Sequence, residues 1–250
     1  MMDGLFDGIR CCGFAGVVLL AFAAAGDPPG PIAFPARAPS GLSLVVPSDT
    51  KGKVYSAIPD RERQASFVSD TPIETVEGHT RSIVGFAVAG PAEDPANLRA
   101  GAWAMPVKSL TTGLANRDAH IREAQWLDAA RFPDVTFRLT RVTGIEATKP
   151  GVYTAVLEGD FSVKGTTRPI QAKGSIAFLK ETPESKTVVA GDLMRLTMAF
   201  TIRLSDYGVS NDIILVRKKI AEEITIMTDL VLSTVPPEQQ PRPKGEAETP

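Results

Sequence analysis

Cysteine and histidine are scarce in this sequence, and their scarcity removes several kinds of chemistry. The 250 residues include two cysteines and two histidines. Cys11 and Cys12 both lie in an apolar stretch near the N-terminus, so a chain that has lost this stretch forms no disulfide and offers no thiolate. His79 and His120 are far apart, and no carboxylates accompany them at ligand spacing, so a zinc site lacks its ligands. We therefore expect no metal site.

A strong net charge is absent as well. Lys and Arg number 27 against 29 Asp and Glu, which gives a formal net charge of -2 and a sequence pI of about 5.8. No basic run interleaved with aromatic residues occurs in the sequence. Because a basic patch is the electrostatic footprint of a nucleic-acid-binding protein, we expect no nucleic-acid partner.

The longest run of apolar and small residues lies near the N-terminus. It extends from Cys11 to Gly26, follows Arg10 and ends with three alanines before Gly26. Such a run is typical of a secretory signal peptide with an A-x-A cleavage site, and it is short for a membrane crossing, which needs about 20 residues. We expect a signal peptide over residues 1–25, cleavage near Ala25, and a periplasmic or secreted protein without a membrane span. An uncleaved anchor is the alternative.

Two segments have compositions that oppose regular structure. Residues 26–52 are rich in proline, glycine and alanine and predict a flexible linker. Residues 236–250 combine prolines with charged side chains and predict a disordered tail. One folded domain is then expected over residues 53–235, which is long enough to bury a sizeable core.

Within this domain the apolar residues recur with a period of two, which predicts strands with one buried face. Five segments alternate clearly and three earlier ones less cleanly. The clear segments are "DVTFRLTRV", "YTAVLEGDFSVKG", "PIQAKGSIAFLK", "MRLTMAFTIRL" and "EEITIMTDLVLST", and the earlier ones are "RQASFVSD", "TRSIVGFAVAG" and "GAWAMPVKSL". Long antiparallel strands favour a barrel over a sandwich, because closure removes exposed edges. We predict an all-β, eight-stranded antiparallel barrel.

The polar faces of these strands indicate which side meets water. They carry Lys164, Lys173, Arg195 and Arg203, which would face lipid in a transmembrane barrel, so we expect a soluble barrel with an apolar interior. The inward residues that we expect to contact a ligand are Trp103, Met105, Phe137, Ala155, Leu157, Phe161, Phe178, Met198, Phe200 and Ile226.

Small inward residues would leave room for a narrow chain between the large ones. They are Ala155, Gly159, Ala172 and Gly174. Barrels of eight strands either hold one small ligand or fill their interior with side chains. Composition does not separate these two alternatives.

Two stretches interrupt the strand pattern. Leu114 to Ala130 is expected to form one α-helix between strands 3 and 4, with Asn116 or Asp118 as its N-cap and Ile121, Ala124 and Leu127 on one face. The segment "SDYGVSNDIILVRKK" is expected to be an irregular crossover between the last two strands. Both are expected at the ends of the barrel.

The start of this helix gathers Arg117, Asp118, His120 and Arg122, with Ser109 nearby. Asp118 and His120 are two residues apart and point in different directions on a helix, so they cannot form the base and orienter of a catalytic triad. We therefore expect that the protein is not an enzyme. One interpretation of the cluster is a capped helix start with an Asp118–Arg122 pair. The other is a site where Arg117, His120 or Arg122 receives an anionic head group.

Three stretches together resemble the YceI-like, polyisoprenoid-binding proteins of bacteria. They are "SLTTGLANRDAHIREAQWLDAARFPDVTF", "GDFSVKGTTRPI" and "FTIRLSDYGV", and the resemblance extends from about Val54 to Leu232. The sequence departs from the family pattern at Ile121, which replaces Leu, and at Phe161 and Ser162. The order of the motifs is more specific than any one of them.

The resemblance implies a secreted, lipocalin-like barrel whose internal tunnel holds a long isoprenoid, such as a polyprenyl phosphate or a quinone. The expected partner is then this lipid or a similar long-chain amphiphile, with no other cofactor. The alternative is a secreted structural or interaction barrel with a filled core and no ligand. The sequence leaves open whether two copies pair as a homodimer.

Overall fold

The computed structural model describes residues 36–37, 43–59, 63–90, 93–209 and 219–241. The expected signal peptide and most of the expected linker and tail lie outside the described residues. So do residues 210–218 of the expected crossover. In the described part of the chain, no helix is both long enough and apolar enough to cross a membrane.

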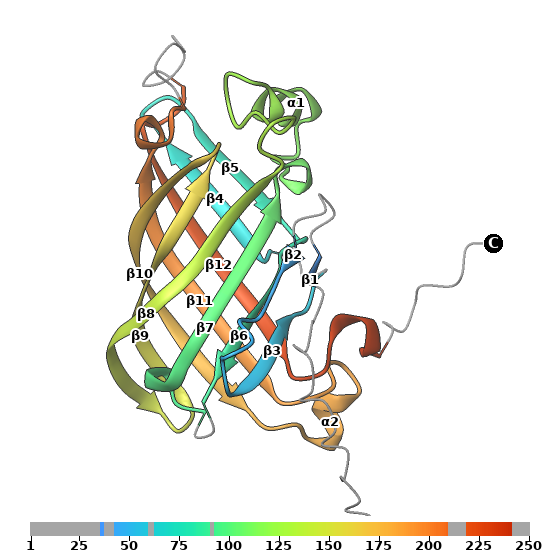
Figure 1. The fold of residues 1–250 in the computed structure, drawn as a ribbon. Helices are drawn as coiled ribbons and strands as arrows, with labels where there is room; N and C mark the ends of the chain where they lie inside the picture. Colours follow the sequence, from blue (N-terminus) through green and yellow to red (C-terminus); the bar gives the residue numbers. More distant parts are fainter. Residues whose placement is uncertain (1–35, 38–42, 60–62, 91–92, 210–218, 242–250) are drawn as a thin grey trace, which may run out of the picture. The chain divides into compact units, whose positions relative to one another are not determined.

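Eight antiparallel strands form a closed ring. Each strand pairs with the next in the order β3, β6, β7, β8, β9, β10, β11 and β12, and β12 pairs again with β3. Figure 1 shows the long strands β7 to β12 crossing the barrel obliquely. The strands are β3 (Lys53–Ala57), β6 (Val84–Ala89), β7 (Leu98–Pro106), β8 (Asp134–Lys149), β9 (Val152–Val163), β10 (Thr166–Leu179), β11 (Leu193–Arg203) and β12 (Glu223–Ser233).

A hairpin of β4 (Ala65–Asp70) and β5 (Thr75–Thr80) extends the wall at one end. β3 pairs with β12 near Leu232, and β4 pairs with the same edge of β12 between Thr225 and Thr228. The outer edge of β5 has one backbone pairing among the described residues, an isolated bridge between His79 and Thr111. The outer edge of β5 is therefore held less tightly than the strands of the ring.

Gln64 joins the hairpin to the ring at the point where the ladder is interrupted. The side chain is fully buried. Its Nε2 donates to the carbonyl of Ile58 at 2.9 Å, and its Oε1 accepts from the amide of Ile83 at 2.8 Å. A buried backbone group without a partner is costly, so this glutamine replaces two of the hydrogen bonds that the ladder would have supplied.

The remaining elements are short. They are β1 (Ala36–Arg37), β2 (Ser43–Leu44), α1 (Ala115–Arg122), α2 (Pro183–Lys186), and the 3-10 helices η1 (Pro95–Asn97), η2 (Val107–Ser109), η3 (Leu204–Tyr207) and η4 (Pro237–Gln239). α1 lies at the end of the barrel that carries β4 and β5, and α2 lies at the opposite end (Figure 1).

The closed eight-stranded antiparallel barrel is confirmed. The expected place of the helix, between strands 3 and 4, does not match the count of all strands, in which α1 follows β7, the seventh; within the ring alone, β7 is the third strand and β8 the fourth. The sequence interpretation missed β3 and β5, whose segments "KVYSA" and "TVEGHT" are too short and too mixed in polarity to show a clear alternation. β1 and β2 have two residues each and show no pattern at all.

The helix is also shorter than the expected range of Leu114 to Ala130. α1 ends at Arg122, and turns follow in which the amides of Trp126 and Asp128 both donate to the carbonyl of Glu123. Asp128 has a positive φ of 50°, which a helix interior does not accept. Leu114 occupies the N-cap position without a side-chain hydrogen bond, so the expectation of Asn116 or Asp118 as N-cap is wrong.

The interior of the barrel divides into two halves. At the α2 end, which we call the packed half, inward side chains from five strands are completely buried. They are Leu157, Ile176, Leu196, Leu230 and Leu232, together with Tyr55 and Met194. The half next to α1 and β5 has the same alternation but is not filled, and we call it the hollow half.

Candidate ligand-binding cavity

The hollow half contains a cavity of about 830 Å³. Its volume falls within the range of roughly 300 to 1,000 Å³ that is usual for small-molecule sites. The walls come from β4, β5, β7, β8, β9, β11 and β12, and α1 with the turn after it lies at the opening. Most of the residues that line it are aliphatic or aromatic.

Strand alternation explains this apolar lining. Met198, Phe200 and Ile202 are alternate residues of β11, and Ile224 and Ile226 are alternate residues of β12. Successive side chains of a strand point to opposite faces of the sheet, so each set points into the barrel while the exposed residues between them, such as Thr201 and Thr225, point outward. The ladder places Phe200 directly opposite Ile226.

Four large side chains form the deepest part of the cavity, which we call the floor: Trp103, Phe137, Phe161 and Met198. The rings of Trp103 and Phe137 are stacked, with centroids 4.8 Å apart, and Phe161 meets Phe200 edge to face at 5.1 Å. One floor-level hydroxyl, Oγ1 of Thr228, is buried and has no hydrogen-bond partner.

The layer below the floor belongs to the packed half. Leu196 is two residues from Met198 on β11, Leu230 is two residues from Thr228 on β12, and Leu157 is four residues from Phe161 on β9. All three leucines are completely buried and none lines the cavity. The cavity is therefore a pocket that ends halfway along the barrel and not a tunnel through it.

An ion pair spans the opening. Nη2 of Arg117, on α1, lies 2.6 Å from Oε1 of Glu74, in the turn between β4 and β5, and both residues line the cavity. His120 and Lys219 line the same region. The opening thus has a cationic side and one carboxylate that already neutralises Arg117.

Asp118 fixes the start of α1. Its carboxylate accepts hydrogen bonds from Oγ1 of Thr111 at 2.6 Å and from the amide and the hydroxyl of Thr112, both at 2.7 Å. Burial opposes ionisation of this carboxyl, but the hydrogen bonds outweigh burial and hold the pKa of Asp118 below its ordinary value. Asp118 therefore anchors the segment that carries Arg117 and His120.

Most of the expected ligand contacts line the cavity, and three do not. The residues that do are Trp103, Met105, Phe137, Phe161, Met198, Phe200 and Ile226. Ala155, Leu157 and Phe178 belong to the packed half, where the ring of Phe178 lies 6.2 Å from that of Tyr55. Alternation predicts the face of a strand on which a residue lies, but not its level along the barrel.

The expected gaps at small residues are also wrong. A Cβ added at Gly174 would lie 1.9 Å from the carbonyl oxygen of Thr197, and one added at Gly159 would lie 2.4 Å from the ring of Phe137. Ala172 is completely buried, and Ala155 is 5% exposed. These residues are small because neighbouring strands and rings approach them closely, not because they leave space for a chain.

The expected head-group residues do not all lie at the opening of the cavity. Arg117 and His120 line the opening, but Arg122 does not, and its Nη2 donates to the carbonyl of Lys108 at 3.0 Å. The carboxylate of Asp118 is held by Thr111 and Thr112 and makes no direct ion pair with Arg122, whose charge only adds a smaller effect that lowers the pKa of Asp118.

Sequence reasoning missed several lining residues. Val163 continues the inward series of β9, so the alternation places it on the correct face, but it was not among the expected ligand contacts. Thr228 was passed over because it is polar, and Ile83, Trp126 and Ile220 lie outside the strands, where alternation gives no signal.

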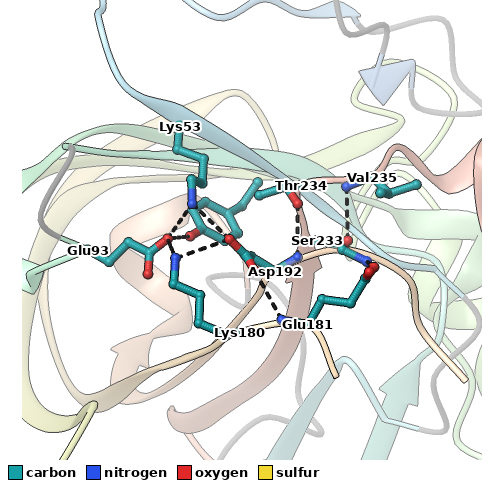
Figure 2. Close-up of polar contacts among 10 residues, drawn as sticks. Lys53, Glu93, Lys180, Glu181, Asp192, Ser233, Thr234 and Val235 are labelled. Atoms are coloured by element: carbon teal, nitrogen blue, oxygen red, sulfur yellow. Dashed lines mark hydrogen bonds and ion pairs between the residues drawn. The ribbon is translucent and has the colours of Figure 1, made fainter. Parts of the chain in front are cut away.

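A second group of charged residues closes the opposite end of the barrel and does not line the cavity. We call Lys53, Glu93, Lys180 and Asp192 the ionic clasp (Figure 2). Nζ of Lys53 lies 2.5 Å from Oε1 of Glu93 and 2.8 Å from Oδ2 of Asp192, and Nζ of Lys180 lies 2.7 and 3.2 Å from the same two atoms. The hydroxyl of Tyr55 donates to Glu93 at 2.9 Å.

The charges of the ionic clasp balance, and its geometry favours the ionised forms. The hydrogen bond from Lys53 is the largest of several effects that lower the pKa of Asp192 to about 2. The same hydrogen bond, with that to Glu93, raises the pKa of Lys53 above its ordinary value. Because all four charges are matched within the group, we assign it to the closure of the barrel and not to ligand binding.

Comparison with known proteins connects this barrel to one family. A family model described as "YceI-like domain" matches residues 57–232. A UPF0312 protein of Pseudomonas putida is 31% identical over 101 residues, which cover 40% of this chain and 47% of that protein. A UPF0312 protein of Vibrio cholerae is 35% identical over 79 residues, which cover 31% of this chain and 39% of that protein. The matches thus span less than half the length of these relatives.

Solved structures with low sequence identity share the fold. BcnA of Burkholderia cenocepacia is 17% identical, with a TM-score of 0.51, and the match covers 72% of this chain and 96% of that one. The YCEI protein of Campylobacter jejuni is 15% identical, with a TM-score of 0.53, covering 65% and 86%. A protein of Saccharophagus degradans described as a polyisoprenoid binding domain is 11% identical, with a TM-score of 0.50, covering 73% and 99%.

Proposed function

We propose, from the premise that this chain belongs to the YceI-like domain family, that it is a lipid-binding protein of the periplasm or the cell exterior. It holds the apolar chain of an isoprenoid, of the polyprenyl phosphate or quinone type, in the cavity of the hollow half. The polar head of the lipid lies at the opening beside α1. The protein binds this lipid and does not transform it.

The observation that carries this proposal is the cavity of about 830 Å³ with its apolar walls. An isoprenoid chain has no polar atoms, so its affinity depends on apolar area removed from water, at roughly 25 cal/mol per Å² before ordering costs. Phe200 and Ile226 offer such area on facing strands. The same class of ligand is supported by the likeness in fold to the protein of Saccharophagus degradans that is described as a polyisoprenoid binding domain.

The arrangement at the opening favours binding over catalysis. Oγ of Ser109 donates to the carbonyl of Pro106 at 2.7 Å and shares a hydrogen bond of 2.6 Å with the hydroxyl of Thr80. A nucleophilic serine needs a base within hydrogen-bond reach, and neither partner of Ser109 is one. Lys219 instead provides a cation that suits an anionic or polar head group, near Arg117, which is paired with Glu74.

Native mass spectrometry tests the proposal on protein purified from the envelope of its host without denaturation. We expect an adduct whose mass corresponds to an isoprenoid lipid. Ile226→Asp places a charge on the cavity wall and should abolish the adduct, because an unpaired buried charge repels an apolar chain. Met227→Asp, on the outward face of the same strand, is the matched control and should keep it.

Two results would contradict the proposal. One is protein without any lipid adduct that also fails to take up isoprenoids from detergent or vesicles. The other is equal binding by the Ile226→Asp and wild-type proteins, which would place the lipid outside the cavity.

A further inference from the structure

We propose that the floor of the cavity sets the length of the isoprenoid chain that this protein holds, and that the limit is about five isoprene units. This inference rests on the proposed function and deepens it, because it replaces a long chain in a tunnel with a short chain in a closed pocket. The specificity-determining residues are Trp103, Phe137, Phe161 and Met198.

The volume of the cavity gives the limit. A carbon atom with its hydrogens occupies about as much space as a water molecule, whose share of liquid volume is roughly 30 Å³. The 830 Å³ of the cavity therefore accommodate on the order of 25 to 30 heavy atoms. This is about five isoprene units if the head group stays at the opening, or about three if a quinone ring also enters.

The chain cannot continue past the floor. The stacked rings of Trp103 and Phe137 block one side, and the layer of Leu157, Leu196 and Leu230 beneath them is completely buried. Protein interiors are packed as densely as organic crystals, so this layer has no space for further carbons. The ionic clasp closes the end beyond it.

Surplus chain must therefore remain outside the opening. Each isoprene unit that enters the cavity loses contact with water, and each unit that stays outside does not. Affinity should rise with chain length until the cavity is full and then stop rising. A tunnel open at both ends would show no such limit.

A series of ubiquinones with the same ring and one, two, four and ten isoprene units tests this limit. Both tryptophans of the sequence, Trp103 and Trp126, line the cavity, so their fluorescence reports binding to the delipidated full chain. We expect the dissociation constant to fall at least about fivefold per added unit up to the limit. Between four and ten units it should fall by no more than about the factor of one further unit, whereas a tunnel would give that factor for each added unit.

Two opposite substitutions change the volume of the cavity. Phe161→Ala removes a ring from the floor and should extend the limit by about one unit. Ala65→Phe adds a ring to the cavity wall and should shorten it by about the same amount. Phe178→Ala removes the same ring from the packed half, outside the cavity, and should leave the limit unchanged. Should one variant fail to fold, the ubiquinone series on the wild-type protein and the other variant still decide.

The outcomes separate this inference from the proposed function. Failure of every ubiquinone and of farnesol to bind would remove the proposed function itself. Binding with an affinity that rises from four to ten units by far more than the factor of one unit would leave the function standing and overturn the floor as the limit. A limit that does not move in either Phe161→Ala or Ala65→Phe would overturn it as well.

Discussion

The two halves of the barrel have the same strands and the same alternation of apolar residues, yet one is filled and the other is hollow. On β11 the inward residues Met194 and Leu196 are completely buried, whereas Met198, Phe200 and Ile202 face the cavity. The difference comes from what surrounds them. The packed half is closed by a full ring of strands and the ionic clasp, whereas the hollow half is bordered by the β4–β5 hairpin and α1.

Composition of single strands therefore does not decide whether a barrel binds a ligand. A hollow interior requires that large inward side chains meet no partner across the barrel, and this depends on how the ring is closed. In the packed half, stability comes from contacts between side chains. In the hollow half, part of the same apolar surface remains available to a ligand.

The sharpest test of this comparison uses two neighbouring inward residues of β11. Leu196→Ala removes a completely buried side chain and should lower the free energy of unfolding by about 2 to 5 kcal/mol, since the packed half cannot collapse around the void. Met198→Ala, two residues away on the cavity wall, should cost clearly less, on the order of 1 kcal/mol, because part of its side chain already faces space. Urea unfolding of the delipidated proteins measures both.

Equal losses for the two variants would contradict the division into halves. They would mean that the cavity is filled in solution by rearranged side chains. Binding gives a second readout, because only Met198→Ala should alter the affinity for an isoprenoid.

Adding volume should show the same contrast between the two halves. Ala172→Leu places extra atoms in the packed half, where Ala172 is completely buried, and should cost about 1 to 3 kcal/mol by overpacking. Ala65→Leu extends into the cavity and should change the unfolding free energy by less than about 0.5 kcal/mol. Thermal melting of both ligand-free variants checks this expectation, and a strongly destabilised Ala65→Leu protein would show that the wall of β4 is already packed.

The sequence allowed the barrel and the faces of its strands to be predicted, because alternation is a local signal. Phe137, Phe161 and Met198 were expected to point inward, and they do. Their level along the barrel was not predictable, because it depends on the register between strands that are far apart in the sequence. Gly174 illustrates this: it looked like a gap, but the ladder places it beside Ala155 and against the backbone of Thr197.

The opening of the cavity was predictable only in part. The cluster on α1 was found from its motif, and Arg117 and His120 do line the opening. The partner of Arg117 was not foreseen, since Glu74 is 43 residues away in the turn of a hairpin whose second strand gave no clear pattern. The ionic clasp was missed because its four residues come from four separate places in the chain.

The ionic clasp should make the closed end sensitive to acid. The pKa of Asp192 is lowered to about 2, chiefly by the hydrogen bond from Lys53, against an ordinary value near 3.8. A carboxyl with a lowered pKa adds stability above its unfolded pKa and loses that contribution as the pH falls through the folded pKa. We expect the unfolding free energy to fall by about 1 to 2 kcal/mol between pH 4 and pH 2 through this residue, after allowing for its partial exposure.

Asp192→Asn tests this expectation by urea unfolding across the pH range. The variant should be less stable than the wild type at pH 7 and should lose this part of the acid dependence. Asp229→Asn breaks an exposed pair with Arg195 on the outer face and serves as the control, with an expected cost of less than about 1 kcal/mol at pH 7. An unchanged acid profile in Asp192→Asn would show that other carboxyl groups govern acid unfolding.

The smallest effect on stability is expected at the opening, where it is matched by an effect on ligand selection. The pair of Arg117 and Glu74 is about one-third exposed on both sides, so Glu74→Gln should lower the unfolding free energy by less than about 1 kcal/mol. The substitution leaves the guanidinium without its carboxylate, and an anionic head group can then take that place. The affinity for farnesyl phosphate should therefore rise about five- to tenfold at low salt, whereas the affinity for neutral farnesol should not change.

Arg117→Gln is the matched control and should remove the preference for the phosphate. If Glu74→Gln improved farnesol binding equally, the ion pair would act as a steric barrier at the opening, and Arg117 would have no part in recognising the head group.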